Sequence, residues 1–122
     1  MKNWARYFVV GSLIFLPVQS WANFVADIPL SAKVARSDAV LIGRVESIKN
    51  QGSDTDEHAV VRVRVVLKGS PPEMIEVITN GPFTEGATEC CKIGGSYLFF
   101  IRRVRGIVYL SANGQYGIYK SD

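Results

Sequence analysis

The chain has 122 residues, with 14 basic and 11 acidic side chains and a formal net charge of +3. Only two cysteines are present, which excludes the disulfide-dense miniature scaffolds found among small secreted proteins. The small charge excess argues against a protein that binds nucleic acid through a strongly basic surface.

Residues 1–22 have the order of segments that is typical of a secretory signal peptide. Lys2 and Arg6 lie in a basic start, an apolar core runs from Phe8 to Val18, and Ser20-Trp21-Ala22 is a small-x-small end. The apolar core is shorter than the roughly 20 residues that span a bilayer, so cleavage after Ala22 is predicted over retention as a membrane anchor. We therefore expect an exported protein, periplasmic or secreted, in an oxidising compartment, with no stable membrane insertion after cleavage.

Residues 23–122 are predicted to form a single domain, because their length suits one modest core and no repeat or linker divides them. Cleavage removes two basic residues, which leaves twelve basic against eleven acidic side chains and a formal charge of +1. A nearly neutral mature chain favours neither nucleic acid nor an anionic membrane as its partner.

The mature chain is predicted to begin with a short helix, because Leu30 and Val34 stand four residues apart just after a proline. The run from Ala39 to Ile48 is typical of a strand, but its apolar positions change phase around Gly43. A glycine at such a position predicts a bulge or a sharp bend in the strand.

A polar loop, Asn50–Glu57, precedes the clearest strand, His58–Lys68. Alternation predicts that this strand has an apolar face and a basic face, with His58 as a surface residue at its end. The apolar face comprises Ala59, Val61, Val63, Val65 and Leu67, and the basic face comprises Arg62, Arg64 and Lys68. A Gly-Ser-Pro-Pro turn then leads into a strand over Met74–Thr79.

The second half of the mature chain is predicted to contain one long loop and three strands. The loop Asn80–Gly95 holds both cysteines and shows no helical period. The strands are Tyr97–Ile101, which is apolar on both faces and therefore central, a hairpin partner at Ile107–Leu110, and a short strand within Gln115–Lys120 after a tight turn. Together the elements predict an all-β fold with a short N-terminal helix: a closed, five- to six-stranded antiparallel OB-like barrel.

Three stretches carry a resemblance to a known family: Ser37–Val45 (SDAVLIGRV), Val63–Gly69 (VRVVLKG) followed by a short strand, and a cysteine and a glycine ahead of Tyr97–Phe100 (YLFF). This pattern, which covers Pro29 to Tyr119, resembles the bacterial secreted domains related to tissue inhibitors of metalloproteinases and netrin-like modules. The resemblance implies an OB-type five-stranded barrel.

The sequence departs from that family at two places that matter for function. The inhibitors use an N-terminal cysteine of the mature protein to chelate the zinc of a protease, whereas this mature chain would begin Asn23-Phe24. Their barrels are tied by disulfides that reach the terminal region, whereas residues 111–122 contain no cysteine. The resemblance therefore implies no cysteine-zinc chelation here, and we expect packing alone to hold the barrel.

Cys90 and Cys91 are the candidate disulfide or redox residues. Neighbouring Cα atoms lie about 3.8 Å apart across a trans peptide, below the roughly 4.4–6.8 Å of most disulfides, so a bond between them needs a cis or twisted peptide. A glycine-rich loop permits that geometry. Four states stay open: a vicinal disulfide, an intermolecular disulfide, free thiols and metal ligands, the last with little support because His58 is the only histidine.

Other chemical motifs are absent: no G-x-S-x-G, H-E-x-x-H, P-loop or phosphate-cradling glycine motif is present. No enzyme activity, cofactor or metal is therefore predicted. Six arginines are expected on solvated strand faces rather than on a nucleic-acid surface, namely Arg44, Arg62, Arg64, Arg102, Arg103 and Arg105.

The sequence thus predicts an exported, non-catalytic binding or interaction module whose partner is an extracytoplasmic protein or glycan. Long loops in small domains are commonly functional, so the loop between the third and fourth strands is the expected site. The candidate contact residues are Asn80, Gly81, Phe83, Glu89 and Lys92. Two alternatives are a peptidase inhibitor without cysteine-zinc chelation and a redox-active protein that uses Cys90 and Cys91.

Overall fold

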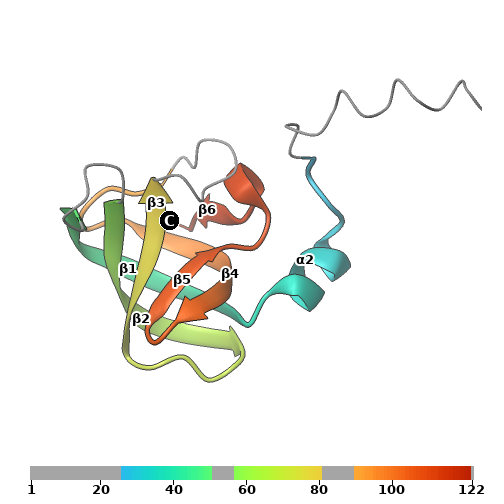
Figure 1. The fold of residues 1–122 in the computed structure, drawn as a ribbon, viewed down its shortest axis with the longest axis horizontal. Helices are drawn as coiled ribbons and strands as arrows, with labels where there is room; N and C mark the ends of the chain where they lie inside the picture. Colours follow the sequence, from blue (N-terminus) through green and yellow to red (C-terminus); the bar gives the residue numbers. More distant parts are fainter. Residues whose placement is uncertain (1–25, 51–56, 81–89, 122) are drawn as a thin grey trace, which may run out of the picture.

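The computed structural model describes residues 26–50, 57–80 and 90–121. The predicted signal peptide and three predicted contact residues, Gly81, Phe83 and Glu89, lie outside these ranges. The elements are α2 (Leu30–Arg36), β1 (Ala39–Asn50), β2 (Glu57–Lys68), β3 (Met74–Asn80), β4 (Ser96–Arg105), β5 (Val108–Ser111), the 3₁₀ turn η2 (Gly114–Tyr116) and β6 (Ile118–Lys120) (Figure 1).

The strands form a closed barrel in the order β1-β2-β3-β5-β4, with a β1–β4 pairing that completes the ring. This confirms the prediction of a small OB-like β-barrel with a short N-terminal helix. One pair, β3–β5, is parallel, whereas the sequence interpretation had only antiparallel pairs. A ring of five strands cannot alternate in direction all the way round, so closure itself requires one parallel neighbour. Strand β6 is additional and pairs with the first half of β4.

Strand β1 is bent, as the sequence predicted. Its register against β2 shifts at three places, one of them between Ile42 and Gly43. A Cβ atom on Gly43 would collide with the side chain of Val61, so a glycine suits this close approach of the two strands. The bend allows β1 to pair with β2 along its length and with β4 over residues 39–44.

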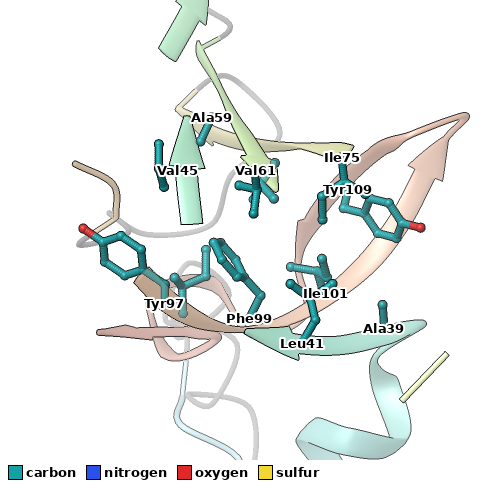
Figure 2. Packing of buried hydrophobic residues seen from close by; sticks show 12 residues of the cluster. Ala39, Leu41, Val45, Ala59, Val61, Ile75, Tyr97, Phe99, Ile101 and Tyr109 are labelled. Carbon is teal, nitrogen blue, oxygen red and sulfur yellow. The ribbon is translucent and has the colours of Figure 1, made fainter. Parts of the chain in front are cut away.

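The core lies inside the barrel and draws side chains from all five ring strands (Figure 2). Ala59 and Val61 of β2 point into it, as predicted. The prediction is wrong for the other end of the same strand, where Val65 is 46% and Leu67 is 61% exposed. Because β3 pairs with β2 only as far as Arg62, the last residues of β2 extend beyond the barrel.

Helix α2 covers the outer face of the barrel over β1 and β4. Val34 of the helix packs against a second buried cluster formed by Val40, Phe100 and Ala112. Strand β4 is therefore covered on both faces, as its apolar sequence predicted. None of the helices in the described part of the chain is long and apolar enough to span a membrane.

Candidate functional site

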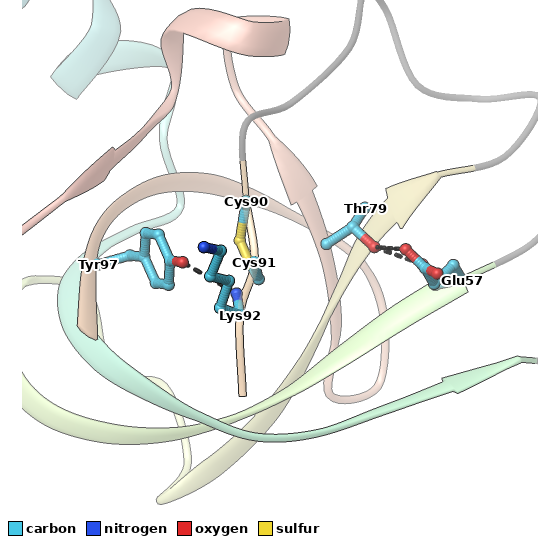
Figure 3. Close-up of a disulfide and its surroundings, with 6 residues drawn as sticks. All are labelled: Glu57, Thr79, Cys90, Cys91, Lys92 and Tyr97. Carbon is cyan, nitrogen blue, oxygen red and sulfur yellow. Dashed lines mark hydrogen bonds between the residues drawn. A yellow bond between two sulfur atoms is a disulfide. The ribbon is translucent and has the colours of Figure 1, made fainter. Parts of the chain in front are cut away.

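The two cysteines lie at the end of the barrel where β3 finishes and β4 begins. Cys90 and Cys91 are joined to one another by a disulfide across a cis peptide bond. Both are half-buried and pack against the main core cluster. Of the four states that the sequence left open, the structure therefore contains the vicinal disulfide, which caps one end of the core (Figure 3). We refer to this end as the disulfide end.

The chain that follows the disulfide is fastened to two strands. The backbone N–H of Lys92 donates to the hydroxyl oxygen of Tyr97 on β4, at 2.9 Å. The N–H of Gly94 donates to the carbonyl of Val45 on β1, at 2.8 Å, and the N–H of Val45 donates to the carbonyl of Gly95, at 2.9 Å. Residues 90–95, which the sequence assigned to one long loop, thus have a fixed position over the barrel.

Glycine is required twice in this segment. Gly94 has a φ of +89°, in the left-handed region that side chains disfavour. A Cβ atom on Gly95 would lie 3.0 Å from Cε1 and 3.1 Å from the hydroxyl oxygen of Tyr97. Because Gly95 has no side chain, the Tyr97 ring can pack beneath the segment, and its hydroxyl oxygen can accept the hydrogen bond from Lys92.

The ends of β2 and β3 lie on the other side of the disulfide (Figure 3). The Thr79 hydroxyl donates to Oε1 of Glu57, at 2.9 Å, and ties the two strand ends together. Asn80 follows Thr79, is exposed and stands opposite Glu57 in the register. Of the five predicted contact residues, Asn80 and Lys92 are described, and the fold brings both to the disulfide end.

A pocket of about 330 Å³ lies beside the disulfide segment and is lined by Lys92, Tyr97, Ile118 and Lys120. Sequence reasoning missed Tyr97 and Lys120 as site residues. Tyr97 was assigned to the central strand only, although the glycine pair before it was a usable signal for a close backbone approach. Lys120 reaches the site because β6 places it opposite Tyr97, and no local pattern predicts that pairing.

His58 is buried, with 1% of its surface exposed, so its prediction as a surface residue is wrong. Its Nδ1 lies 2.9 Å from Oε1 of Glu76 and acts as the donor, because a carboxylate can only accept. This bond satisfies one ring nitrogen and makes burial tolerable. No hydrogen bond joins His58 to either cysteine in the described ranges, and its Nε2 has no partner there.

Glu76 is shared by two basic groups. Lys49 Nζ lies 2.7 Å from its Oε2, and His58 contacts its other oxygen. Burial alone raises the pKa of the Glu76 carboxyl, but the hydrogen bonds from His58 and Lys49 outweigh it, so the net pKa lies below the ordinary value of 4.5. The three side chains link β1, β2 and β3.

All six arginines that were predicted on solvated strand faces are exposed. Arg62 forms ion pairs with Glu46 and Glu73, at 3.4 and 3.6 Å. Among the described residues, no group of three or more histidine, cysteine or acidic side chains is arranged to hold a metal ion.

Comparison with protein-family models gave no match, and comparison with curated proteins gave none either.

Proposed function

We propose that this protein is an exported, non-catalytic binding module that contacts an extracytoplasmic partner through its disulfide end. One observation carries the proposal: residues 90–95 are held by the disulfide, by the core beneath it and by hydrogen bonds to both β1 and β4. A surface that is already ordered loses little conformational entropy when a partner binds, which favours affinity.

The shape of this end also suits binding. The pocket of about 330 Å³ lies next to the fixed segment, and exposed side chains such as Asn80 and Lys92 stand around the disulfide. Binding sites in small domains are commonly concave and placed on loops that a rigid scaffold supports. The barrel is such a scaffold, because it has a closed ring of strands and a buried core.

A redox role for the cysteine pair is the second candidate, and the partial exposure of both cysteines favours it. A thiolate from a partner protein would attack one sulfur of the disulfide and form a mixed disulfide, and the other cysteine would leave as a thiolate. In this alternative the partner's dithiol is oxidised and the Cys90–Cys91 bond is reduced.

Membership of the family related to tissue inhibitors of metalloproteinases and netrin-like modules is also part of the proposal. The strand pattern in the sequence and the five-stranded barrel support it, although barrels of this kind serve many functions. Peptidase inhibition, if present, would have to proceed without cysteine-zinc chelation.

Site-specific photocrosslinking in the producing cells tests the proposed surface. A photoreactive residue in place of Lys92 is expected to yield a discrete crosslinked product with one partner. The matched control is the same residue in place of Val104, which is 46% exposed at the opposite end of the barrel. Equal or greater crosslinking from position 104 would show that the disulfide end is not the contact surface.

The crosslinking also separates the two candidates. Serine at both positions 90 and 91 removes any redox chemistry but leaves the hydrogen bonds of residues 92–95 in place. A binding module still crosslinks to its partner from position 92 in this background, with a lower yield because the disulfide no longer orders the segment, whereas a thiol-exchange protein loses its mixed-disulfide partner.

Export is tested by the intact mass of the native protein, which is expected to correspond to residues 23–122. A mass that includes residues 1–22, recovered in the membrane fraction, would replace this proposal with a membrane-anchored protein.

A further inference from the structure

The pocket at the disulfide end has a lining of unusual chemical composition. Its four described lining residues are two lysines, a tyrosine and an isoleucine, from the segment after the disulfide and from β4 and β6. None of these four residues is acidic. These four residues offer hydrogen-bond donors and positive charge from Tyr97 and the two lysines, and an apolar contact from Ile118.

Tyr97 supplies the first donor. Its side chain is buried, with 4% of its surface exposed, and its oxygen already accepts the backbone N–H of Lys92. The hydroxyl proton remains, and no acceptor for it exists in the part of the chain that the structure describes. A buried hydroxyl whose proton has no acceptor is uncommon, because leaving a buried donor unsatisfied costs free energy.

The two lysines supply the charge. Lys92 is exposed, and among the described residues its ammonium group has no ion pair or hydrogen bond. Lys120 also lines the pocket, and its Nζ lies 6.0 Å from the centre of the Tyr97 ring, a cation–π contact that holds this second ammonium group over the tyrosine. Both positive charges raise the electrostatic potential around the Tyr97 hydroxyl.

We infer that this pocket binds a carboxylate, carried by an acidic side chain of an extended segment of a partner protein. The inference rests on the proposed binding function and names the chemistry that the same surface recognises. The carboxylate accepts the hydroxyl proton of Tyr97 through one oxygen and lies between the ammonium groups of Lys92 and Lys120. The methylene groups of the acidic side chain pack against Ile118.

A carboxylate fits this lining better than a phosphate group. Phosphate recognition in proteins uses several donors at once, commonly arginine forks or a run of backbone N–H groups. Three backbone N–H groups of the segment, those of Lys92, Gly94 and Gly95, already donate within the protein. One hydroxyl and two flexible ammonium groups match the two oxygens of a carboxylate.

A protein partner also fits better than an acidic glycan. The Tyr97 ring is buried and its face is covered by Lys120, so it offers no open aromatic surface on which a sugar ring can stack. The apolar wall at Ile118 instead matches the aliphatic part of a glutamate side chain.

The test uses purified mature protein and an N-acetylated hexaglutamate peptide as the probe, followed by NMR of the backbone amides. The expected result is saturable shifts that are largest at Lys92, Tyr97 and Lys120, and weaker binding at higher ionic strength. Hexaglutamine should cause no saturable shift. Inorganic phosphate and an oligogalacturonate of the same charge are the two competing anions.

Three variants define the pocket. Lys120→Gln and Lys92→Gln are each expected to weaken the binding of hexaglutamate about 2- to 5-fold, the range for an exposed ion pair. Tyr97→Phe keeps the ring and removes the hydroxyl, and it should weaken binding about 10-fold. The matched control is Arg105→Gln, which removes one positive charge at the opposite end of the barrel and should leave the affinity unchanged.

The outcomes are distinct. Equal effects of Lys120→Gln and Arg105→Gln would show only a general attraction to net charge and would overturn the site. Tighter binding of phosphate or oligogalacturonate than of hexaglutamate would overturn the assignment to an acidic peptide. If hexaglutamate does not bind but crosslinking from position 92 still captures a partner, the carboxylate inference fails and the proposed binding function stands.

Discussion

His58 and Glu76 are paired across neighbouring strands, with 2.9 Å between Nδ1 of the imidazole and Oε1 of the carboxylate. Glu76 stands opposite Val60 in the register of β2 and β3, so it reaches His58 diagonally, two residues along the strand. The carboxylate holds the ring of a buried histidine and also binds Lys49 of β1. Three strands of the barrel are thus connected through one acidic side chain.

The first prediction concerns the pH dependence of stability. The pKa of Glu76 is lower in the folded protein than its ordinary value of 4.5, because the hydrogen bonds from His58 and Lys49 outweigh the effect of burial. At pH values between the folded and the unfolded pKa of Glu76, the unfolded chain therefore binds more protons than the folded protein does. The stabilisation from Glu76 is complete above pH 4.5 and is lost as the pH falls through the folded pKa.

Urea unfolding at pH 7 and at pH 3 measures this effect. Glu76→Gln should lower the free energy of unfolding at pH 7 by about 1–3 kcal/mol, since it weakens two hydrogen bonds to a charged group. The same substitution should change the free energy of unfolding much less at pH 3, because the charge of Glu76 is lost as the pH falls. The control is Glu73→Gln. Glu73 is exposed and its ion pair with Arg62 is long, at 3.6 Å, so this substitution should change the stability little at either pH. An equal loss at both pH values in Glu76→Gln would contradict the proposed role of the charge.

Most of the fold followed from the sequence because its signals are local. The alternation of apolar residues in β2, the glycine in β1 and the apolar run in β4 each predicted their element. The exposure of Val65 and Leu67 was missed, since it depends on how far β3 extends alongside β2. The burial of His58 was missed because its partner, Glu76, lies eighteen residues away in sequence.

The second prediction concerns Lys33, which fastens α2 to the barrel. Its Nζ donates to Oδ1 of Asp27, at 2.9 Å, and to the hydroxyl of Tyr119 on β6, at 2.6 Å. The same ammonium group lies 5.0 Å from the centre of the Tyr119 ring. Lys33→Met keeps the aliphatic packing but removes these contacts, so it should lower the free energy of unfolding by about 1–3 kcal/mol.

Thermal or urea unfolding measures that change. Arg36→Met is the matched control, because Arg36 is exposed on the same helix and should cost less than about 0.5 kcal/mol. A loss in Lys33→Met no larger than in Arg36→Met would show that the buried ammonium group is not what holds the helix.

The third prediction concerns the glycine under which Tyr97 is packed. Gly95→Ala places a methyl group about 3 Å from the Tyr97 ring and hydroxyl, so the ring must shift and the hydrogen bond from Lys92 must lengthen. The backbone amide of Lys92 should then exchange its hydrogen with solvent faster, by about 10-fold, which corresponds to the loss of roughly one hydrogen bond.

Gly106→Ala is the control for this measurement. Gly106 has a positive φ of +50° but no atom within 4 Å of the added Cβ, and it lies in the β4–β5 turn. The variant should reduce the overall stability without a selective effect at Lys92. Unchanged exchange at Lys92 in Gly95→Ala would mean that the Tyr97 hydroxyl does not hold the segment.

The site was less predictable from the sequence than the fold. The glycine pair at 94–95 and the adjacent cysteines pointed to the segment that forms the proposed site. Lys120 joins that segment only through the pairing of β6 with β4. The role of Tyr97 depends on its contact with the backbone N–H of Lys92, and the residue pattern of β4 does not predict that contact.

The last prediction concerns the redox state and the energetic role of the cysteine pair. The proposed export would place the protein in an oxidising environment, and in the structure Cys90 and Cys91 are bonded to one another. Alkylation of the native monomer without reductant should therefore label no thiol, whereas alkylation after reduction in denaturant should label two. Two labels without reductant, or a reducible dimer, would contradict the vicinal bond.

The disulfide closes a ring with no residue between its cysteines, so it removes little entropy from the unfolded chain. Serine at both positions should consequently cost only about 1 kcal/mol of stability, from the two sulfur atoms that no longer pack on the core. A loss of about 3 kcal/mol or more, as is common for disulfides that close long loops, would show that the pair contributes substantially to the stability of the barrel.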